Sequence, residues 1–155
     1  MPIVSHIFYL SYPRVDNYAF SKSFNVSQND FEAVRQIDTK AAGADYIVLS
    51  HQIFSAAALQ EYGFKKYYKT PAEEIFYYAL PTGDIMYEYF QKMVYGRADR
   101  ATMNAAMDLV GVKQAFLVLH DYWNSFATAA PQAKSSADEW WTVGNGKILI
   151  FKYKK

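Results

Sequence analysis

The sequence contains no cysteine, and this absence excludes several kinds of site. Without thiols the chain cannot form a disulfide, bind a metal through thiolates or use a cysteine nucleophile. The chain also lacks a charge bias, because 16 basic residues stand against 15 acidic ones and the net charge is +1. Since nucleic-acid binding requires a basic surface that neutralises phosphates, we expect no nucleic-acid partner.

Motifs that would identify a common catalytic or nucleotide site are also missing. The sequence has no G-x-S-x-G nucleophile elbow, no P-loop and no dinucleotide-binding fingerprint. The uncharged segment before Arg14 has no basic stretch ahead of it and is too short to cross a bilayer, which takes about 20 apolar residues. The sequence as it stands therefore predicts a soluble chain.

Aromatic residues, by contrast, are abundant, with 14 Tyr, 11 Phe and 3 Trp in 155 residues. They gather in residues 64–68, 76–78 and 87–90. Tyr combines an apolar ring with a polar hydroxyl, so such clusters suit half-buried packing faces, sugar stacking or a membrane interface. Packing is the more general explanation, because most aromatic side chains fill cores.

The order of apolar segments and turn residues predicts an α/β fold. Helical patterns cover residues 27–43, 55–62, 84–96, 99–111 and 131–141, and strand patterns cover residues 46–49, 64–68, 75–80, 115–119 and 148–153. Strands that alternate with helices favour parallel pairing through right-handed crossovers. We therefore predict a single α/β domain over residues 27–155, with a mixed, mostly parallel sheet flanked by helices. Residues 1–26 are predicted to be an extended N-terminal segment that packs on this domain.

Three of the predicted strands are followed directly by polar side chains. These candidate ligand-binding residues are His51 and Gln52 after the first strand, Thr82 and Asp84 after another, and His120 and Asp121 after a third. Ligands of open α/β sheets bind at the carboxyl edge of parallel strands. If the three strands are parallel neighbours, two imidazoles and two carboxylates meet at one rim. Such a set could do acid–base chemistry or hold a divalent ion weakly.

Helix capping explains the same residues without any chemistry. Polar side chains at strand-to-helix junctions accept hydrogen bonds from backbone N–H groups that the first turn of a helix leaves unpaired. We favour this interpretation, and with it we expect no catalytic residue, no metal and no cofactor.

Acidic residues next to two tryptophans form a second candidate site. Asp138 and Glu139 precede Trp140 and Trp141, as in a carbohydrate platform. Adjacent residues of a helix point about 100° apart, so on the predicted helix the two indoles cannot form one flat surface. We expect one indole in the core and the other over an edge.

Several phrases resemble a known group of membrane proteins. They are V-D-N-Y-A-F at 15–20, D-Y-I-V-L-S at 45–50, A-A-A-L-Q-E-Y-G-F-K-K-Y-Y at 56–68, P-T-G-D-I-M-Y-E-Y-F at 81–90, H-D-Y-W at 120–123 and A-D-E-W-W at 137–141. Together they resemble the soluble C-terminal region of large polytopic proteins similar to GT-C-type glycosyltransferases. Enzymes of that family use a lipid-linked sugar donor and carry their catalytic acidic residue in a loop of the transmembrane part. No segment here matches that loop, so the resemblance transfers no catalytic residue.

Three functional hypotheses follow. The first is a non-catalytic soluble accessory domain of a membrane glycosyltransferase-like protein, tethered on the extracytoplasmic face, which recognises a glycan or acceptor or packs on the membrane part. The second is a free-standing small α/β enzyme or ligand-binding protein that uses the polar rim. The third is a structural homo-oligomerisation module, whose aromatic face would be buried between copies.

Overall fold

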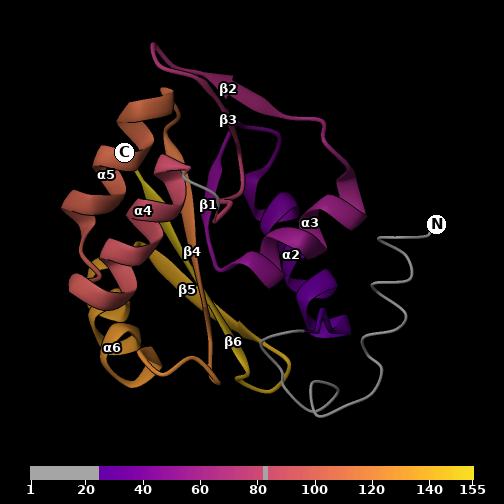
Figure 1. The fold of residues 1–155 in the computed structure, drawn as a ribbon. Helices are drawn as coiled ribbons and strands as arrows, with labels where there is room; N and C mark the ends of the chain where they lie inside the picture. Colours follow the sequence, from indigo (N-terminus) through magenta and orange to yellow (C-terminus); the bar gives the residue numbers. More distant parts are fainter. Residues whose placement is uncertain (1–24, 82–83) are drawn as a thin grey trace.

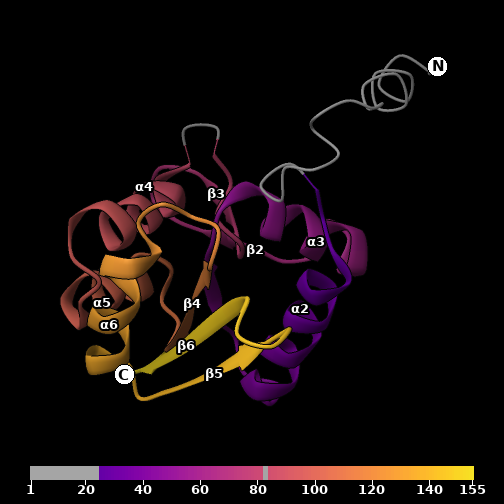
Figure 2. The same ribbon diagram turned by 90° about the horizontal axis from the view of Figure 1, so that it is seen from below.

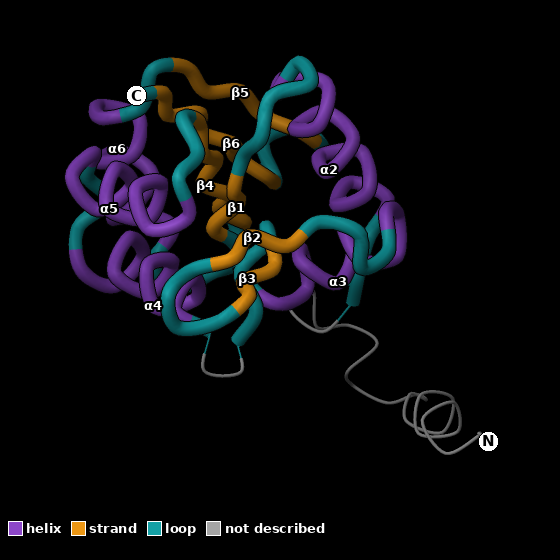
Figure 3. Tube along the Cα trace, turned by 90° about the horizontal axis from the view of Figure 1, so that it is seen from above, coloured by secondary structure: helices purple, strands orange, loops and turns teal. Residues whose placement is uncertain are grey.

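The computed structural model describes residues 25–81 and 84–155, so the predicted N-terminal segment lies almost wholly outside the described residues. The described part has three layers, with a sheet between two groups of helices (Figures 1 and 3). One face of the sheet carries α2 (Gln28–Ala41) and α3 (Gln52–Tyr62), and the other carries α4 (Ile85–Gln91), the π-helix η5 (Lys92–Gly96), α5 (Arg100–Val110) and α6 (Phe126–Ser136). None of the helices in these ranges is long and apolar enough to cross a membrane.

The central sheet is mixed, as predicted, but it is not mostly parallel. Its strands are β1 (Ile47–Leu49), β4 (Gln114–His120), β6 (Ile148–Lys154) and β5 (Glu139–Val143), in that spatial order. Among the strands of the described residues, β1 and β4 are the one parallel pair, and β6 is antiparallel to both of its neighbours. The prediction is wrong because residues 139–143 form a strand instead of the end of a helix, and the tight turn at Asn145 and Gly146 then returns β6 antiparallel to it.

A small antiparallel pair, β2 (Tyr67–Lys69) and β3 (Glu74–Phe76), stands apart from the central sheet. Figure 1 shows it projecting beyond the amino-terminal end of β1. The chain after β3 returns to the main sheet, where Tyr78 forms a parallel bridge with Val48. The predicted strand 75–80 therefore divides into a short hairpin strand and a bridge beside β1.

Strand β4 is buried along its whole length, and its residues alternate between the two layers of helices. Leu117 and Leu119 pack in the cluster beneath α4, α5 and α6, whereas Phe116 and Val118 pack beneath α2 and α3. Side chains two apart on a strand lie on the same face. This alternation places His120, the last residue of β4, on the α2–α3 side.

The predicted helix at 131–141 is wrong in both of its boundaries. Helix α6 begins at Phe126, and Pro131 lies inside it instead of in the first turn. Residues 139–143 pair with β6 and form a strand, because aromatic and β-branched side chains fit a pleated, half-buried surface. Adjacent strand residues face opposite ways, so Trp140 is exposed while Trp141 packs against the α2–α3 cluster.

Candidate functional site

The two histidines of the predicted rim come into direct contact. Because β1 and β4 are parallel neighbours, the residues that end them meet at one edge of the sheet, which Figure 2 views from below. The His51 Nε2 and His120 Nδ1 atoms lie 3.1 Å apart. Only 2% of His51 and 3% of His120 is exposed, so both rings are core side chains.

A buried carboxylate in the first turn of α2 holds the second histidine. Asp30 Oδ1 lies 2.6 Å from His120 Nε2. Its Oδ2 atom accepts hydrogen bonds from the Ser27 backbone N–H at 2.8 Å and the Ser27 hydroxyl at 2.9 Å, and the Asp30 N–H donates back to that hydroxyl. Ser27 and Asp30 thus form a capping box at the start of α2, and its acidic member also binds His120, 90 positions away.

Tyr122 and Trp123 cover the outer side of His51. The Tyr122 hydroxyl oxygen lies 3.0 Å from His51 Nε2. The Trp123 indole stacks on the His51 ring, with the centroids 5.0 Å apart and the planes 9° from parallel. We call the four hydrogen-bonded residues Asp30, His51, His120 and Tyr122 the histidine cluster.

Backbone geometry determines where the protons of the histidine cluster lie. The Ile53 N–H donates to His51 Nδ1, because His51 is the N-cap of α3. That nitrogen must carry a lone pair, so the proton of neutral His51 is on Nε2. His51 Nε2–H then donates to His120 Nδ1, and His120 Nε2–H donates to the Asp30 carboxylate. Tyr122 shares the His51 proton as a second acceptor.

Burial and these hydrogen bonds shift the pKa values in the directions that preserve this arrangement. Burial, with a smaller contribution from His120, lowers the pKa of His51 from 6.5 to about 3. Burial alone would raise the pKa of Asp30, but His120 and Ser27 together bring it below its usual value. Burial raises the pKa of the Tyr122 hydroxyl. At neutral pH the cluster therefore holds a carboxylate, neutral His51 and a neutral phenol.

No basic atom of the two rings is left for chemistry. His51 Nδ1 is engaged by Ile53 and His120 Nδ1 by His51, so neither ring can accept a substrate proton or ligate a metal without breaking a buried hydrogen bond. Within residues 25–81 and 84–155, no group of three His, Asp or Glu side chains is placed to hold a metal ion. The hydrogen bonds of the cluster join α2, α3 and β4, so its geometry supports a structural role.

The remaining predicted rim residues do not join this cluster. Asp84 is the N-cap of α4, and its carboxylate accepts hydrogen bonds from the backbone of Leu80 and Met86. Gln52 is exposed in the first turn of α3, and Asp121 is exposed while its backbone N–H bonds Lys147. Thr82 lies outside the described residues. Helix capping, the interpretation favoured from the sequence, thus accounts for Asp84. It also accounts for His51, whose ring caps α3.

Sequence reasoning missed Asp30, Tyr122 and Trp123 as members of this site. Asp30 is recognisable as a capping residue, but nothing local distinguishes it from a solvent-exposed cap. The available signal is the alternation of β4, which sends His120 toward the layer that contains α2. Comparison of the chain with family models, with curated proteins and with solved structures finds no match.

Proposed function

We propose that the chain is a non-catalytic α/β binding domain that works beside a membrane glycosyltransferase-like protein. The non-catalytic part of this proposal rests on the hydrogen bonding of the histidine cluster. The four ring nitrogens of His51 and His120 are all engaged in hydrogen bonds within the chain. A catalytic base needs a free lone pair within reach of its substrate.

The surface best suited to binding is the hairpin of β2 and β3. Phe64 is 67% exposed and Tyr67 is 43% exposed, and both rings pack on buried Phe76. We call Phe64 and Tyr67 the aromatic hairpin surface. Exposed rings that rest on a rigid support lose little entropy when they bind. Such a surface suits the hydrophobic face of a sugar or the interface of a bilayer.

The expected partner follows from the aromatic hairpin surface and from the sequence resemblance. Lys65 lies between the two rings in the sequence and Lys69 follows them, and both are exposed. Lys66 lies over the rings of Tyr46 and Tyr77. Alternating basic and aromatic side chains are typical of segments that meet lipid headgroups. A domain with this surface would pack on the membrane part of a glycosyltransferase-like protein or hold its glycan or acceptor.

Binding to vesicles and oligosaccharides tests this proposal. The chain should bind phosphatidylcholine and phosphatidylserine vesicles or a panel of oligosaccharides, measured by sedimentation and by calorimetry. Replacing both rings (Phe64→Ser with Tyr67→Ser) should weaken that binding by about tenfold or more, because each loses an apolar side chain from the contact.

Tyr95 offers a matched control, since it is an exposed ring on η5, outside the hairpin. Tyr95→Ser should leave binding within about twofold, as expected for a change outside the contact. An unmodified chain that responds to neither vesicles nor oligosaccharides would refute the proposed function.

The histidine cluster favours one rival, a metal-dependent or ligand-binding role, because His51 and His120 approach within 3.1 Å. We expect Zn²⁺ and Mn²⁺ to leave the melting temperature of the chain unchanged, since metal binding would require a free ring nitrogen. Thermal unfolding with and without each ion measures this directly. A rise in melting temperature that His120→Asn abolishes would support the rival.

A further inference from the structure

Strand β5 is an open edge of the central sheet. In the part of the chain that the structure describes, β5 pairs with β6 alone. The turn that joins them closes with a hydrogen bond from the Lys147 N–H to the Gly144 carbonyl. Residues of an antiparallel pair alternate between bonded and non-bonded positions. The Asp121 N–H donates to the Lys147 carbonyl, so alternate β6 residues from Lys147 onward bond β4, and the residues between them bond β5. Trp141, which pairs with Ile150, therefore faces β6, and the backbone groups of Trp140 and Thr142 face the open edge.

Two of the features that usually prevent pairing with another strand are missing from this edge. Residues 139–143 contain no proline and no lysine. Among the described residues, no hydrogen bond joins the edge-facing backbone groups of β5 to any other part of the chain. An edge of this kind is a template for a further strand.

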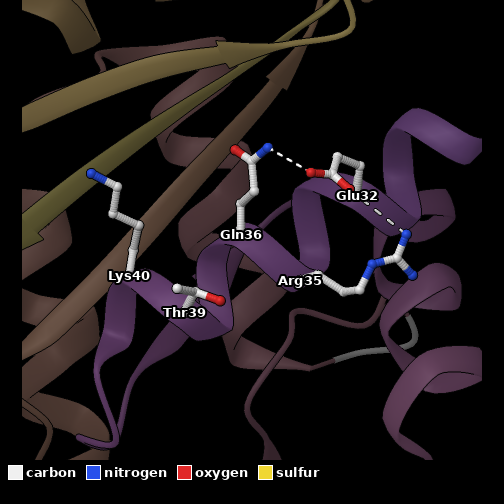
Figure 4. A pocket seen from close by; sticks show the side chains of 5 residues that line it. All are labelled: Glu32, Arg35, Gln36, Thr39 and Lys40. Carbon is white, nitrogen blue, oxygen red and sulfur yellow. Dashed lines mark hydrogen bonds and ion pairs between the residues drawn. The ribbon is translucent and has the colours of Figure 1, made fainter.

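Helix α2 runs beside β5 and presents a row of three polar side chains to it. Glu32, Gln36 and Lys40 are spaced four residues apart and lie along one side of the helix (Figure 4). Gln36 Oε1 accepts a hydrogen bond from the Trp141 indole at 2.8 Å. Lys40 Nζ lies 2.8 Å from the Glu139 carboxylate. An open groove of about 450 Å³ lies along this row.

Along the helix, the row carries a negative, a neutral and a positive side chain in that order. A second copy of the row that runs in the opposite direction therefore places opposite charges next to each other. A two-fold axis beside Trp141 would also pass close to Gln36, because the two side chains are hydrogen-bonded. Such an axis pairs β5 antiparallel with its copy. It places Glu32 opposite Lys40 of the second copy and Lys40 opposite Glu32.

We propose that the open edge of β5 and the Glu32–Gln36–Lys40 row form a two-fold interface between two copies of this chain. The two central sheets join through β5 into one continuous sheet, with Trp141 opposite its copy and Trp140 opposite Thr142. Aromatic pairs at directly opposed positions stabilise antiparallel strands. The partner is thus a second copy, and each copy contributes the same surface.

The spacing of the layers is compatible with this interface. Helix α2 contacts both β5 and β6, so it lies over the outer part of the sheet. Paired strands lie about 4.8 Å apart. The two copies of α2 would then run antiparallel at roughly 10 Å, which is the usual distance between packed helices. An extended peptide could also pair with the edge of β5, but it would give Glu32 and Lys40 of α2 no partners of opposite charge.

Charge reversal tests the interface directly, and sedimentation equilibrium of the full chain is the measurement. The unmodified chain should dimerise. Glu32→Lys and Lys40→Glu should each raise the dimer dissociation constant by roughly tenfold or more, since each creates two like-charged contacts in a two-fold interface. The double variant Glu32→Lys/Lys40→Glu should restore dimerisation, because it reverses the order of charges and keeps them complementary.

Glu88→Lys is the matched control, because Glu88 is exposed on α4, on the opposite face of the sheet. It makes the same charge change and should leave the dissociation constant unchanged. A chain that stays monomeric at its highest soluble concentration would overturn the proposal. So would a dimer that survives both single reversals, or a double variant that fails to recover while its circular dichroism and melting temperature match the unmodified chain. This proposal is independent of the proposed function, because no vesicle or sugar enters the measurement.

Discussion

Replacing Asp30 with alanine is expected to lower the free energy of unfolding by about 3–5 kcal/mol, which is typical when one member of a buried charged contact is removed. The carboxylate is 2% exposed and accepts hydrogen bonds from His120 and from two groups of Ser27. Its removal leaves the His120 Nε2–H without an acceptor in the core, and an unsatisfied buried group destabilises a fold. Urea denaturation followed by circular dichroism measures the change.

Two further variants separate the buried contact from the helix cap. Ser27→Ala removes only the capping hydroxyl and should reduce stability by about 1 kcal/mol. Asp30→Asn keeps an acceptor for His120 but loses the negative charge, so its effect should fall between those of the other two variants. If Asp30→Ala proves no more destabilising than Ser27→Ala, the contact with His120 contributes little to stability.

Acidification is expected to destabilise the chain well above the pH at which carboxylates usually protonate. Burial lowers the pKa of His51 to about 3 in the folded chain, against about 6.5 when it is unfolded. Between these values the unfolded chain binds a proton that the folded chain does not. The free energy of unfolding therefore falls as the pH falls, and His51 contributes about 1.4 kcal/mol for each pH unit.

Asp30 acts in the same direction at lower pH. Its folded pKa lies below its unfolded value, so its contribution to stability is present above the unfolded pKa and is lost as the pH falls through the folded pKa. Denaturation curves recorded from neutral pH down to the acid transition measure both effects.

His51→Asn isolates the histidine contribution. Asparagine can still cap α3 but does not titrate, so the decline between pH 6.5 and pH 4 should be shallower in this variant than in the unmodified chain. Equal slopes in the two proteins would show that His51 does not remain neutral in the folded state.

Local sequence signals predicted most of the helices and several of their capping positions correctly. Ser27 and Asp30 form a capping box, and Asp84 and Asp99 cap helices where polar residues precede apolar periodicity. These features depend on residues within one helical turn of each other, so a single sequence contains the necessary information. The meeting of His51 and His120 was predicted on the condition that their two strands are parallel neighbours, and β1 and β4 do pair in parallel.

The mostly parallel sheet and the helix at 131–141 were wrong because both depend on strand pairing. Residues 139–143 pair with β6, and β6 lies between β4 and β5, which no local pattern specifies. Trp140 and Trp141 fit a helix or a strand equally well until a neighbouring strand is present, since β-propensity depends on cross-strand contacts.

By itself, the sequence determined which segments are apolar, where helices begin, and that no thiol or nucleotide motif is present, because these properties reside in single residues or short spacings. The tertiary structure alone decided that Asp30 meets His120, that the ring nitrogens of both histidines are engaged, and that β5 lies at an open edge. These features join residues far apart in the chain. Their free energy comes from burial and hydrogen bonds that exist only after the layers have packed together.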